Sequence, residues 1–404
     1  MSIERLSEGC NKLRSLPAVR AAMQTLREKP PCSVCAIFSE IAMMNTSRAT
    51  WTRRALLAGA AAAASPAAVL RLPAPVRVAI VGVEGHPGEI TQPLDTMPDV
   101  QVAAVADADA DALARFQRSS RHLAKARTYR DYRRMLDAEK PDVVAVCNSN
   151  GERVAAILEA ARRQHHIIAE KPLAMTRGDL ERVKTAVAGN RVRLGMLLPM
   201  RFAPPFLMLK QIVDRGEIGE VVQISAQKSY QLEDRPDWFK HRETYGSTIL
   251  WIGPHMLDLM RFTSGRSFRE VASFMGRPQF SESGSMETST ATCLRLDNGG
   301  TATLHMDYCR PATAPTHGDD RLRLAGTRGV AEYMESTGVV LMTVDQKPHR
   351  VENLPAAGSV FRDYIAHVYA GAPTSLPLAD IYAVCEAAIA AHEAAIQNRL
   401  IPLA

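Results

Sequence analysis

A strand-like run that leads directly into a glycine-rich turn constrains the fold of this chain more than any other feature. Residues 76–81 read Val-Arg-Val-Ala-Ile-Val, and such a mostly apolar, β-branched run is typical of a strand buried in a parallel sheet. The turn that follows is Gly82-Val83-Glu84-Gly85-His86-Pro87-Gly88. Glycines here allow a tight turn and let a pyrophosphate approach the N-terminus of the next helix. We therefore expect a nucleotide-binding βα unit whose helix begins at Gly88 and ends near Met97.

An acidic residue stands where such a unit needs one. Residues 100–106 predict a second strand, and Asp107 follows it, 25 residues after Gly82. A carboxylate there accepts hydrogen bonds from the adenosine ribose and repels a 2′-phosphate, which favours NAD over NADP. The glycine spacing is one residue longer than G-x-G-x-x-G, so the turn alone is weak support. The flanking strand, helix and acid together favour a cofactor site over an ordinary glycine-rich loop.

Helices and strands continue to alternate as far as residue 198. We expect strands at 143–147, 166–169 and 192–197, and helices at 131–139, 152–163 and 177–188. Repeated βα units predict a parallel sheet with helices on both faces, here a Rossmann domain over residues 71–198. Ligands of such sheets bind at the carboxyl ends of the strands. Asn148, Ser149 and Lys171 follow closely after two of these strand ends and are expected to face the cofactor.

The second half of the chain has a different pattern, in which strand-like runs dominate. The expected strands are 221–230, 270–274, 288–296, 302–308, 322–325 and 339–343. The expected helices are 204–214, 255–263, 360–369 and 378–398. This pattern predicts a second domain over residues 199–404, which ends in a long helix.

The basic charge of the chain lies in its first 70 residues. The formal net charge is +6 at pH 7, and residues 1–70 account for +5 of it. The rest of the chain is nearly neutral, so the composition gives no reason to expect a nucleic-acid partner.

The basic region contains the features of an export signal. Arg53-Arg54 opens an Ala-rich run that ends near Leu70, too short and weakly apolar for a stable membrane span of about 20 residues. Because paired arginines resemble a twin-arginine signal, we expect residues 44–70 to direct the protein through the export machinery to a periplasmic or other extracytoplasmic location. An uncleaved N-terminal anchor is the alternative. Residues 1–43 lie too far ahead of the arginines, and we interpret them as an upstream artefact or a disordered segment.

Cysteine usage points neither to a disulfide framework nor to a metal. Seven cysteines in 404 residues are too sparse for a disulfide scaffold. Cys32 and Cys35 form a lone C-x-x-C, which could be a redox motif or half a metal site, but no second pair follows nearby. No set of His, Cys and carboxylates shows the spacing of metal ligands, so we expect no metal site.

A series of motifs in a fixed order resembles one enzyme family. Glu170-Lys171-Pro172 follows a short strand, and Met200-Arg201-Phe202, residues 216–220, residues 253–258 and the terminal helix come after it. From about Val76 onward, the chain resembles the Gfo/Idh/MocA family, which includes glucose–fructose oxidoreductase and inositol dehydrogenase.

The resemblance implies a fold and an activity. The fold is a Rossmann domain followed by a C-terminal α/β domain with a large, mostly antiparallel open sheet. One face of that sheet commonly forms the subunit interface, which implies a homo-oligomer, a dimer or a tetramer. The implied reaction is hydride transfer between NAD and a secondary alcohol carbon of a sugar, a cyclitol or a derivative.

Two residues are the candidates for catalysis. By resemblance, Lys171 polarises the reacting hydroxyl, and its charge can stabilise negative charge on oxygen. His255 can take the hydroxyl proton, because a histidine titrates near neutrality. Asp258 lies three residues further on, on the same face of a predicted helix, where it either orients the histidine or pairs structurally.

Two positions depart from the family pattern. Members often carry an Asp four residues before the histidine, but Trp251 stands here, and an indole cannot accept a proton. Where the family has a further histidine this chain has Arg153, to which we assign no role. The departures leave two alternatives open: an NAD-dependent glycosidase that uses transient oxidation and elimination, or a non-catalytic ligand-binding protein.

The candidate site residues form two sets. The expected cofactor-binding residues are Gly82, Gly85, His86, Gly88, Asp107, Asn148, Ser149, Glu170 and Lys171. The candidates for substrate contact are Arg201, Trp238, Asp258, Tyr308 and His317. Trp238 could stack on a sugar ring, and Tyr308 and His317 leave a predicted strand and loop that could line a pocket.

Overall fold

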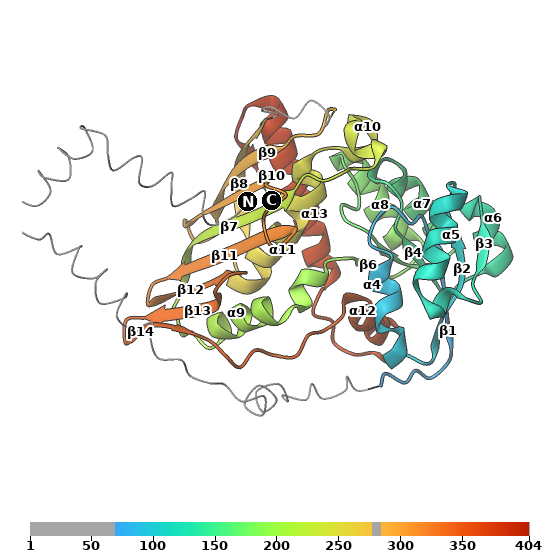
Figure 1. Ribbon diagram of the computed structural model, residues 1–404, viewed down its shortest axis with the longest axis horizontal. Helices are drawn as coiled ribbons and strands as arrows, with labels where there is room; N and C mark the ends of the chain where they lie inside the picture. The colour runs from blue at the N-terminus through green and yellow to red at the C-terminus, as the bar shows by residue number, and fades with distance from the viewer. Residues whose placement is uncertain (1–68, 277–283, 404) are drawn as a thin grey trace, which may run out of the picture. The chain divides into compact units, whose positions relative to one another are not determined.

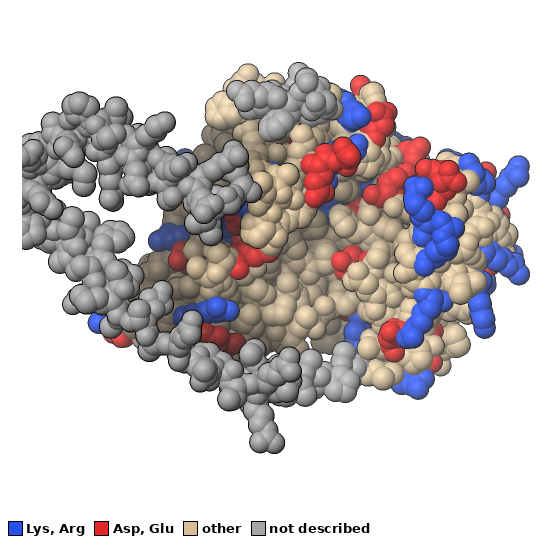
Figure 2. Space-filling view, in the orientation of Figure 1, with Lys and Arg blue, Asp and Glu red and all other residues tan. Residues whose placement is uncertain are grey.

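The computed structural model describes residues 69–276 and 284–403. The expected segment 1–43, nearly all of the expected signal peptide 44–70 and the Cys32/Cys35 pair lie outside the described residues. No helix in the described ranges is long and apolar enough to cross a membrane. The face drawn in Figure 2 carries acidic and basic side chains close to one another, without one continuous basic patch.

The first domain is built on a six-stranded parallel sheet (Figure 1). Its strand order is β3-β2-β1-β4-β5-β6. The strands are β1 (Val76–Val81), β2 (Val100–Ala106), β3 (Arg127–Tyr129), β4 (Val143–Val146), β5 (His166–Ala169) and β6 (Leu194–Met196). The helices are α4 (Gly88–Thr91), α5 (Ala110–Ser119), α6 (Tyr132–Glu139), α7 (Asn150–Arg162) and α8 (Arg177–Gly189). The expected Rossmann fold is confirmed.

Two details of this domain differ from the sequence-based expectation. The helix after the glycine turn is a single α-helical turn, α4, which continues as a 3-10 helix at Gln92–Thr96. Pro93 lies at the start of that 3-10 segment, and since it lacks an N–H it cannot continue the α-helical bonding. The short strand β3 and helix α5 were not expected, although Asp109 is an N-cap and Leu113 and Phe116 follow at helical spacing.

The strand register brings three loops to one edge of the sheet. Val81 of β1 pairs with Val146 of β4, and Val146 pairs with Ala169 of β5. The residues that follow these strands therefore meet at the same carboxyl edge, which is where ligands of such sheets bind. They are the glycine turn that begins at Gly82, the Asn148 loop, and Glu170 with Lys171.

The second domain contains a nine-stranded sheet of order β14-β13-β12-β11-β7-β10-β9-β8-β15. Only the β7–β10 pair is parallel among its pairings in the described residues. The strands are β7 (Val221–Gln231), β8 (Phe268–Gly276), β9 (Ser289–Leu296), β10 (Thr301–Arg310), β11 (Gly318–Gly326), β12 (Gly329–Met334), β13 (Gly338–Thr343), β14 (Gln346–Arg350) and β15 (Ile401–Pro402). The expected large, mostly antiparallel sheet is confirmed.

Long helices cover one face of this sheet (Figure 1). They are α9 (Pro204–Asp214), α11 (Thr248–Ser264) and α13 (Leu378–Gln397), with α10 (Arg242–Tyr245) and α12 (Val360–Ala370) elsewhere in the domain. Along β9 and β10 every second side chain is buried beneath the helices and the others are exposed on the opposite face. This period of two is what a sheet with one covered face requires.

Helix α11 is longer than the sequence predicts. The expected helix began at His255, directly after Gly253 and Pro254, two residues that disfavour a helix interior. The structure begins it at Thr248, where the side chain of Ser247 caps the helix by accepting from the backbone N–H of Leu250. Residues 248–260 are all buried, so packing outweighs the hydrogen bond that Pro254 cannot donate. As a result Trp251 and His255 lie one turn apart on the same helix.

Candidate active site

The glycine turn forms one wall of a cleft of about 470 Å³ at the carboxyl edge of the parallel sheet. Gly82 has a φ of 77°, and a Cβ there would lie 2.4 Å from the Cα of Asn148, so no side chain fits at this position. The side-chain oxygen Oδ1 of Asn148 is buried and has no hydrogen-bond partner among the described residues. A close backbone cradle with an unpaired acceptor beside it fits a dinucleotide such as NAD.

Asp107 is fixed at the end of β2, where the sequence predicted a ribose acceptor. Its carboxylate accepts from the backbone N–H of Val83 at 2.9 Å and of Asp109 at 2.7 Å. It lines the cleft together with Arg130 and Arg133. These contacts tie the acid to the glycine turn, so both ends of the expected cofactor site are held in one arrangement.

The other predicted cofactor residues lie around the same edge. Gly85 donates its N–H to the carbonyl of Cys147 at 2.8 Å, and Gly88 is the first residue of α4. Ser149 is buried and is the N-cap residue of α7. Gly85 and Gly88 are half-buried and Ser149 is buried, so all three residues lie around the edge where the strands end.

Lys171 is buried at the centre of the site. Its ammonium nitrogen Nζ donates a 2.7 Å hydrogen bond to the carbonyl oxygen of Trp251 and lies 3.2 Å from the centroid of that indole ring. Glu170 Oε1 is 3.8 Å from Nζ. Burial lowers the pKa of Lys171 to about 7, and the charges of Arg153 and Lys228 lower it further against the opposing effect of Glu170. Near neutral pH this lysine can therefore donate to, or accept from, a reacting oxygen.

His255 lies in the same site but lacks a partner. Its ring nitrogen Nδ1 is buried and makes no hydrogen bond to any residue in the described part of the chain. Burial, together with the charges of Lys171 and Lys228, holds the pKa of His255 well below its usual range. The ring is therefore neutral at pH 7, and the more distant Glu170 carboxylate only partly opposes this effect.

Asp258 pairs with Arg201 rather than with the histidine. Arg201 Nε donates to Asp258 Oδ2 at 3.1 Å, and a second bond joins the same two groups. Arg201 also donates to the carbonyl of Ser375 and to Asp380. Both substrate candidates are about 1% exposed and connect α11 to the start of α13, which is a structural role.

His86 is the histidine of the site that has a carboxylate partner. Its Nδ1 is 2.8 Å from Glu170 Oε2, and its backbone N–H donates to the same oxygen at 2.9 Å. The ring stacks on Trp251, with centroids 5.9 Å apart and planes 16° apart, and its centroid lies 6.4 Å from that of His255. Burial alone would raise the pKa of Glu170, but His86, Lys171 and Arg153 hold it well below its usual range.

The remaining substrate candidates belong to an aromatic region next to Trp251. Trp238 meets Trp251 edge to face, with centroids 5.3 Å apart, and its Nε1 has no partner within the ranges described. The Tyr308 hydroxyl is buried, 3.3 Å from that of Tyr245. His317 stacks on Tyr230 and its Nδ1 is 3.0 Å from Glu233 Oε1, at a half-exposed position. Trp238 thus contacts the catalytic centre directly, while His317 lies at the outer end of the aromatic region.

Sequence reasoning missed two buried cations. Arg153 donates to Asn150 Oδ1 at 2.7 Å and to the carbonyls of Lys171, Pro172 and Asn148, so one side chain fastens two strand-end loops together. Lys228 is buried on β7 and pairs with Asp320 at 2.8 Å. A period of two in β7 places Lys228 on the face of Ile224 and Ala226, and a lysine in that apolar series could have been noticed.

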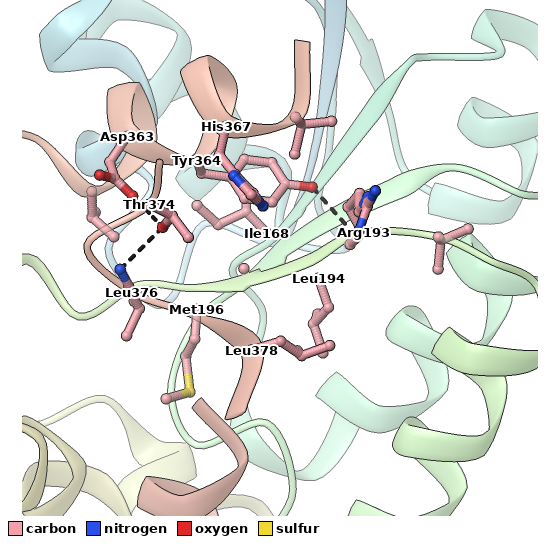
Figure 3. Close-up of a pocket in the computed structure, with 14 residues that line it drawn as sticks. Ile168, Arg193, Leu194, Met196, Asp363, Tyr364, His367, Thr374, Leu376 and Leu378 are labelled. Carbon is pink, nitrogen blue, oxygen red and sulfur yellow. Dashed lines mark hydrogen bonds between the residues drawn. The ribbon is translucent and has the colours of Figure 1, made fainter. Parts of the chain in front are cut away.

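A second cavity lies away from this site, between β6 and α12 (Figure 3). Its volume is about 100 Å³. Its polar groups are paired with one another: Tyr364 donates to the carbonyl of Arg193, and Thr374 donates to Asp363 at 2.6 Å. This cavity shares no residue with the cleft. No group of three or more His, Cys, Asp or Glu that could hold a metal occurs in residues 69–276 and 284–403.

Comparison with known proteins bears on both domains. One family model, described as an oxidoreductase family with an NAD-binding Rossmann fold, matches residues 76–197. A second, described as the GFO/IDH/MocA C-terminal domain, matches residues 206–332. The expected cofactor, NAD, is thereby confirmed for the Rossmann domain, whereas the preference for NAD over NADP stays a prediction.

Individual relatives are dehydrogenases. Myo-inositol 2-dehydrogenase of Thermotoga maritima is 25% identical over 274 residues, 66% of this chain and 78% of that protein. D-glucoside 3-dehydrogenase of Escherichia coli is 29% identical over 259 residues, 58% of this chain and 70% of that protein. A solved structure of a candidate oxidoreductase from Thermotoga maritima is 30% identical, with a TM-score of 0.77, and the match covers 81% of this chain and 100% of that one.

Proposed function

The chain belongs to the Gfo/Idh/MocA family of NAD(P)-dependent oxidoreductases, and on that premise we propose that it oxidises or reduces a secondary alcohol carbon of a sugar, a cyclitol or a derivative. The observation that carries this proposal is a cluster around Trp251, which contacts Lys171 and Trp238 and lies one helical turn from His255. His86 of the glycine turn, which lines the cofactor cleft, stacks on the same indole. Relatives named for inositol and glucoside oxidation support a polyhydroxylated substrate.

Each residue has a role that follows from its surroundings. Bound NAD supplies the hydride acceptor, and the glycine turn and Asp107 would hold its pyrophosphate and ribose. Lys171 hydrogen-bonds the reacting oxygen and stabilises its developing negative charge, an effect strengthened by the buried site. Trp238, with an unpaired Nε1 and an apolar ring, suits contact with both a hydroxyl and the face of a sugar ring.

The proposal is tested with the full chain, purified and denatured so that any bound nicotinamide can be identified by mass spectrometry. Added NAD is then titrated by calorimetry, and myo-inositol, D-glucose and methyl β-D-glucoside are assayed for NADH formation. We expect NAD binding and turnover of at least one of these classes. Lys171→Met should abolish turnover while NAD still binds, and the exposed Lys125→Met should change neither. Absence of NAD binding in repeated preparations would overturn the proposal.

A redox-neutral glycosidase remains the second candidate, and Trp251 is the observation that favours it. The carboxylate that family dehydrogenases often place four residues before the histidine is absent, and Nδ1 of His255 has no partner among the residues described. Transient oxidation followed by elimination would release an aglycone without accumulating NADH. Assay of an aryl β-glucoside for both products separates the two functions: NADH formation favours the dehydrogenase, and aglycone release alone favours the glycosidase.

We also propose that the enzyme acts outside the cytoplasm and as a homo-oligomer. The support for export is the Arg53-Arg54 pair with its Ala-rich run. Arg53→Lys with Arg54→Lys should retain the protein in the cytoplasmic fraction. The support for self-association is the uncovered sheet face, on which short side chains such as Ala291 and Thr303 are exposed. Light scattering should give the mass of a dimer or a tetramer. Ala291→Arg combined with Thr303→Arg should dissociate that oligomer into monomers.

A further inference from the structure

The glycine turn carries a histidine that is arranged like a general base. His86 and Glu170 are 84 residues apart in the chain, yet the Nδ1 atom of the ring lies 2.8 Å from the carboxylate. The histidine side chain is 50% exposed, whereas Glu170 is fully buried. A cofactor-cradling turn requires small residues and backbone N–H groups, so neither an imidazole nor its carboxylate partner is explained by phosphate binding.

The contacts of the pair fix the orientation of the imidazole. An ionised carboxylate only accepts hydrogen bonds, so Nδ1 must donate to Glu170 and the proton-accepting lone pair lies on Nε2. The backbone N–H of His86 holds the same oxygen, and the backbone N–H of Lys171 holds the other at 3.0 Å. The carboxylate is thus fixed by two backbone donors, and stacking on Trp251 limits rotation of the ring.

The position of the ring connects it to the candidate chemistry. Its centroid lies 6.4 Å from that of His255, and it stacks on the indole of Trp251, which also contacts the Lys171 ammonium. His255 has a buried Nδ1 without a partner in the structure as described, and the nearest turn of its helix offers an indole in place of an acid. A proton on His255 would therefore be a buried charge without a hydrogen-bonded carboxylate, whereas the His86 ring is hydrogen-bonded directly to the Glu170 carboxylate.

We propose that His86 is a catalytic residue of this enzyme and that its Nε2, backed by Glu170, accepts the proton of the reacting hydroxyl. The proposal rests on the proposed function, which supplies NAD as the oxidant. The O–H bond breaks and its proton goes to Nε2, the C–H hydrogen leaves with its electron pair to NAD, and the alcohol becomes a carbonyl. Because the His86 side chain is half-exposed, the imidazolium then returns the proton to water. Lys171 hydrogen-bonds the oxygen. His255 stays neutral, fills part of the site and offers a ring nitrogen for hydrogen bonding.

The competing explanation is that His86 contacts the cofactor and takes no part in proton transfer. NAD affinity and turnover distinguish this explanation from the proposal. His86→Ala is compared with wild type in NAD affinity, by calorimetry, and in turnover of the best substrate of the sugar and cyclitol panel. We expect an NAD dissociation constant within about twofold of wild type and turnover lower by about a hundredfold or more. Added imidazole should restore part of the rate of His86→Ala, because it replaces a missing proton acceptor but not a missing cofactor contact. Weakened NAD binding with unchanged turnover would overturn the proposal.

A matched control is available in the same domain. His122 is bonded to Asp95 at 2.7 Å, so it forms a histidine–carboxylate pair outside the cleft, and His122→Ala should leave both measurements unchanged. His255→Ala should lose less turnover than His86→Ala; a larger loss would return the acid–base role to His255. Nitrogen NMR of the wild type, without substrate, should show the proton of neutral His86 on Nδ1, and a proton on Nε2 would overturn the arrangement. The NMR measurement tests the His86–Glu170 arrangement even if no substrate of the panel reacts. A lack of turnover with every substrate would count only against the proposed function.

Discussion

The ammonium of Lys171 lies 3.2 Å from the centroid of the Trp251 ring and donates a hydrogen bond to the carbonyl oxygen of the same residue. One residue of α11 therefore holds the charged group by its backbone dipole and by the negative face of its indole. A carboxylate at that position would hold the lysine firmly protonated, whereas an aromatic face attracts the cation without neutralising it. The lysine consequently keeps an environment in which burial dominates its acid–base behaviour.

The first prediction concerns stability and pH. Burial lowers the pKa of Lys171 to about 7 from an ordinary value of 10.5, so between these pH values the unfolded chain binds more protons than the folded one. Stability should therefore rise with pH across this window, and the penalty should be complete below pH 7. Lys171→Met lacks the group, so we expect its melting temperature to exceed that of wild type at pH 6 and the gap to narrow by pH 10. A constant gap in thermal scans would show that the lysine does not titrate there.

A second prediction concerns the glycine turn. Gly82→Ala puts a side chain at a φ of 77° and brings a Cβ to 2.4 Å from Asn148, so strain of about 1 kcal/mol or more adds to a forced shift of the Asn148 loop. NAD affinity by calorimetry should fall before the fold is lost. Gly178→Ala is the control, since this helical glycine has open space around it and should gain about 0.5 kcal/mol in urea unfolding. Equal NAD affinity in both variants would contradict the cradle.

The third prediction concerns Arg153. Arg153→Met keeps the length of the side chain but leaves the carbonyls of Asn148, Lys171 and Pro172 without their buried donor. We expect a loss of about 3 kcal/mol in the free energy of unfolding together with weaker NAD binding. Arg162→Met lies on the same helix with an exposed side chain and should cost less than about 0.5 kcal/mol. Urea unfolding measures the loss of stability, and calorimetric titration measures the loss of NAD affinity.

The fourth prediction separates the two roles that the sequence allowed for Asp258. Asp258→Asn removes the negative charge and one of the two oxygens that accept from buried Arg201, which should cost about 3 kcal/mol or more. Turnover of the folded fraction should change little. Asp214→Asn breaks an exposed pair with Lys210 and should cost less than about 0.5 kcal/mol. Unchanged stability with lost turnover would instead assign Asp258 to the orientation of His255.

The sequence was most informative where a residue's neighbours in the chain determine its environment. The strand 76–81, the glycine turn and the alternation of helices and strands predicted the parallel sheet. Each of these signals is carried by residues that are close together in the chain, so it can be recognised without knowing the tertiary contacts. The ordered motifs from Glu170-Lys171-Pro172 onward predicted the antiparallel domain by resemblance. The expected start of α11 at His255 was wrong, because the helix runs through Pro254, which the burial of residues 248–260 makes tolerable.

The contacts of the candidate site were less predictable, because they join distant parts of the chain. His86 was assigned to the cofactor from its place in the turn, and nothing local indicated that Glu170 would bind its ring. Arg153 departed from a family pattern and was left without a role, although three backbone carbonyls from two loops meet at its guanidinium. Such convergence depends on the register of β4 and β5, whose continuous apolar runs have no alternation from which a register could be read.

The guanidinium of Arg153 has a consequence for anyone who would redesign this enzyme. Grafting the loops of a relative onto this scaffold would treat the segment at Asn148 and the segment at Lys171 as separate modules. Because a single side chain at the start of α7 is fastened to both, they are one inseparable insert. A chimaera that transplants either loop alone would leave the Arg153 guanidinium without acceptors, or the loop carbonyls without their donor. A successful exchange must therefore move the two loops and the first turn of α7 together.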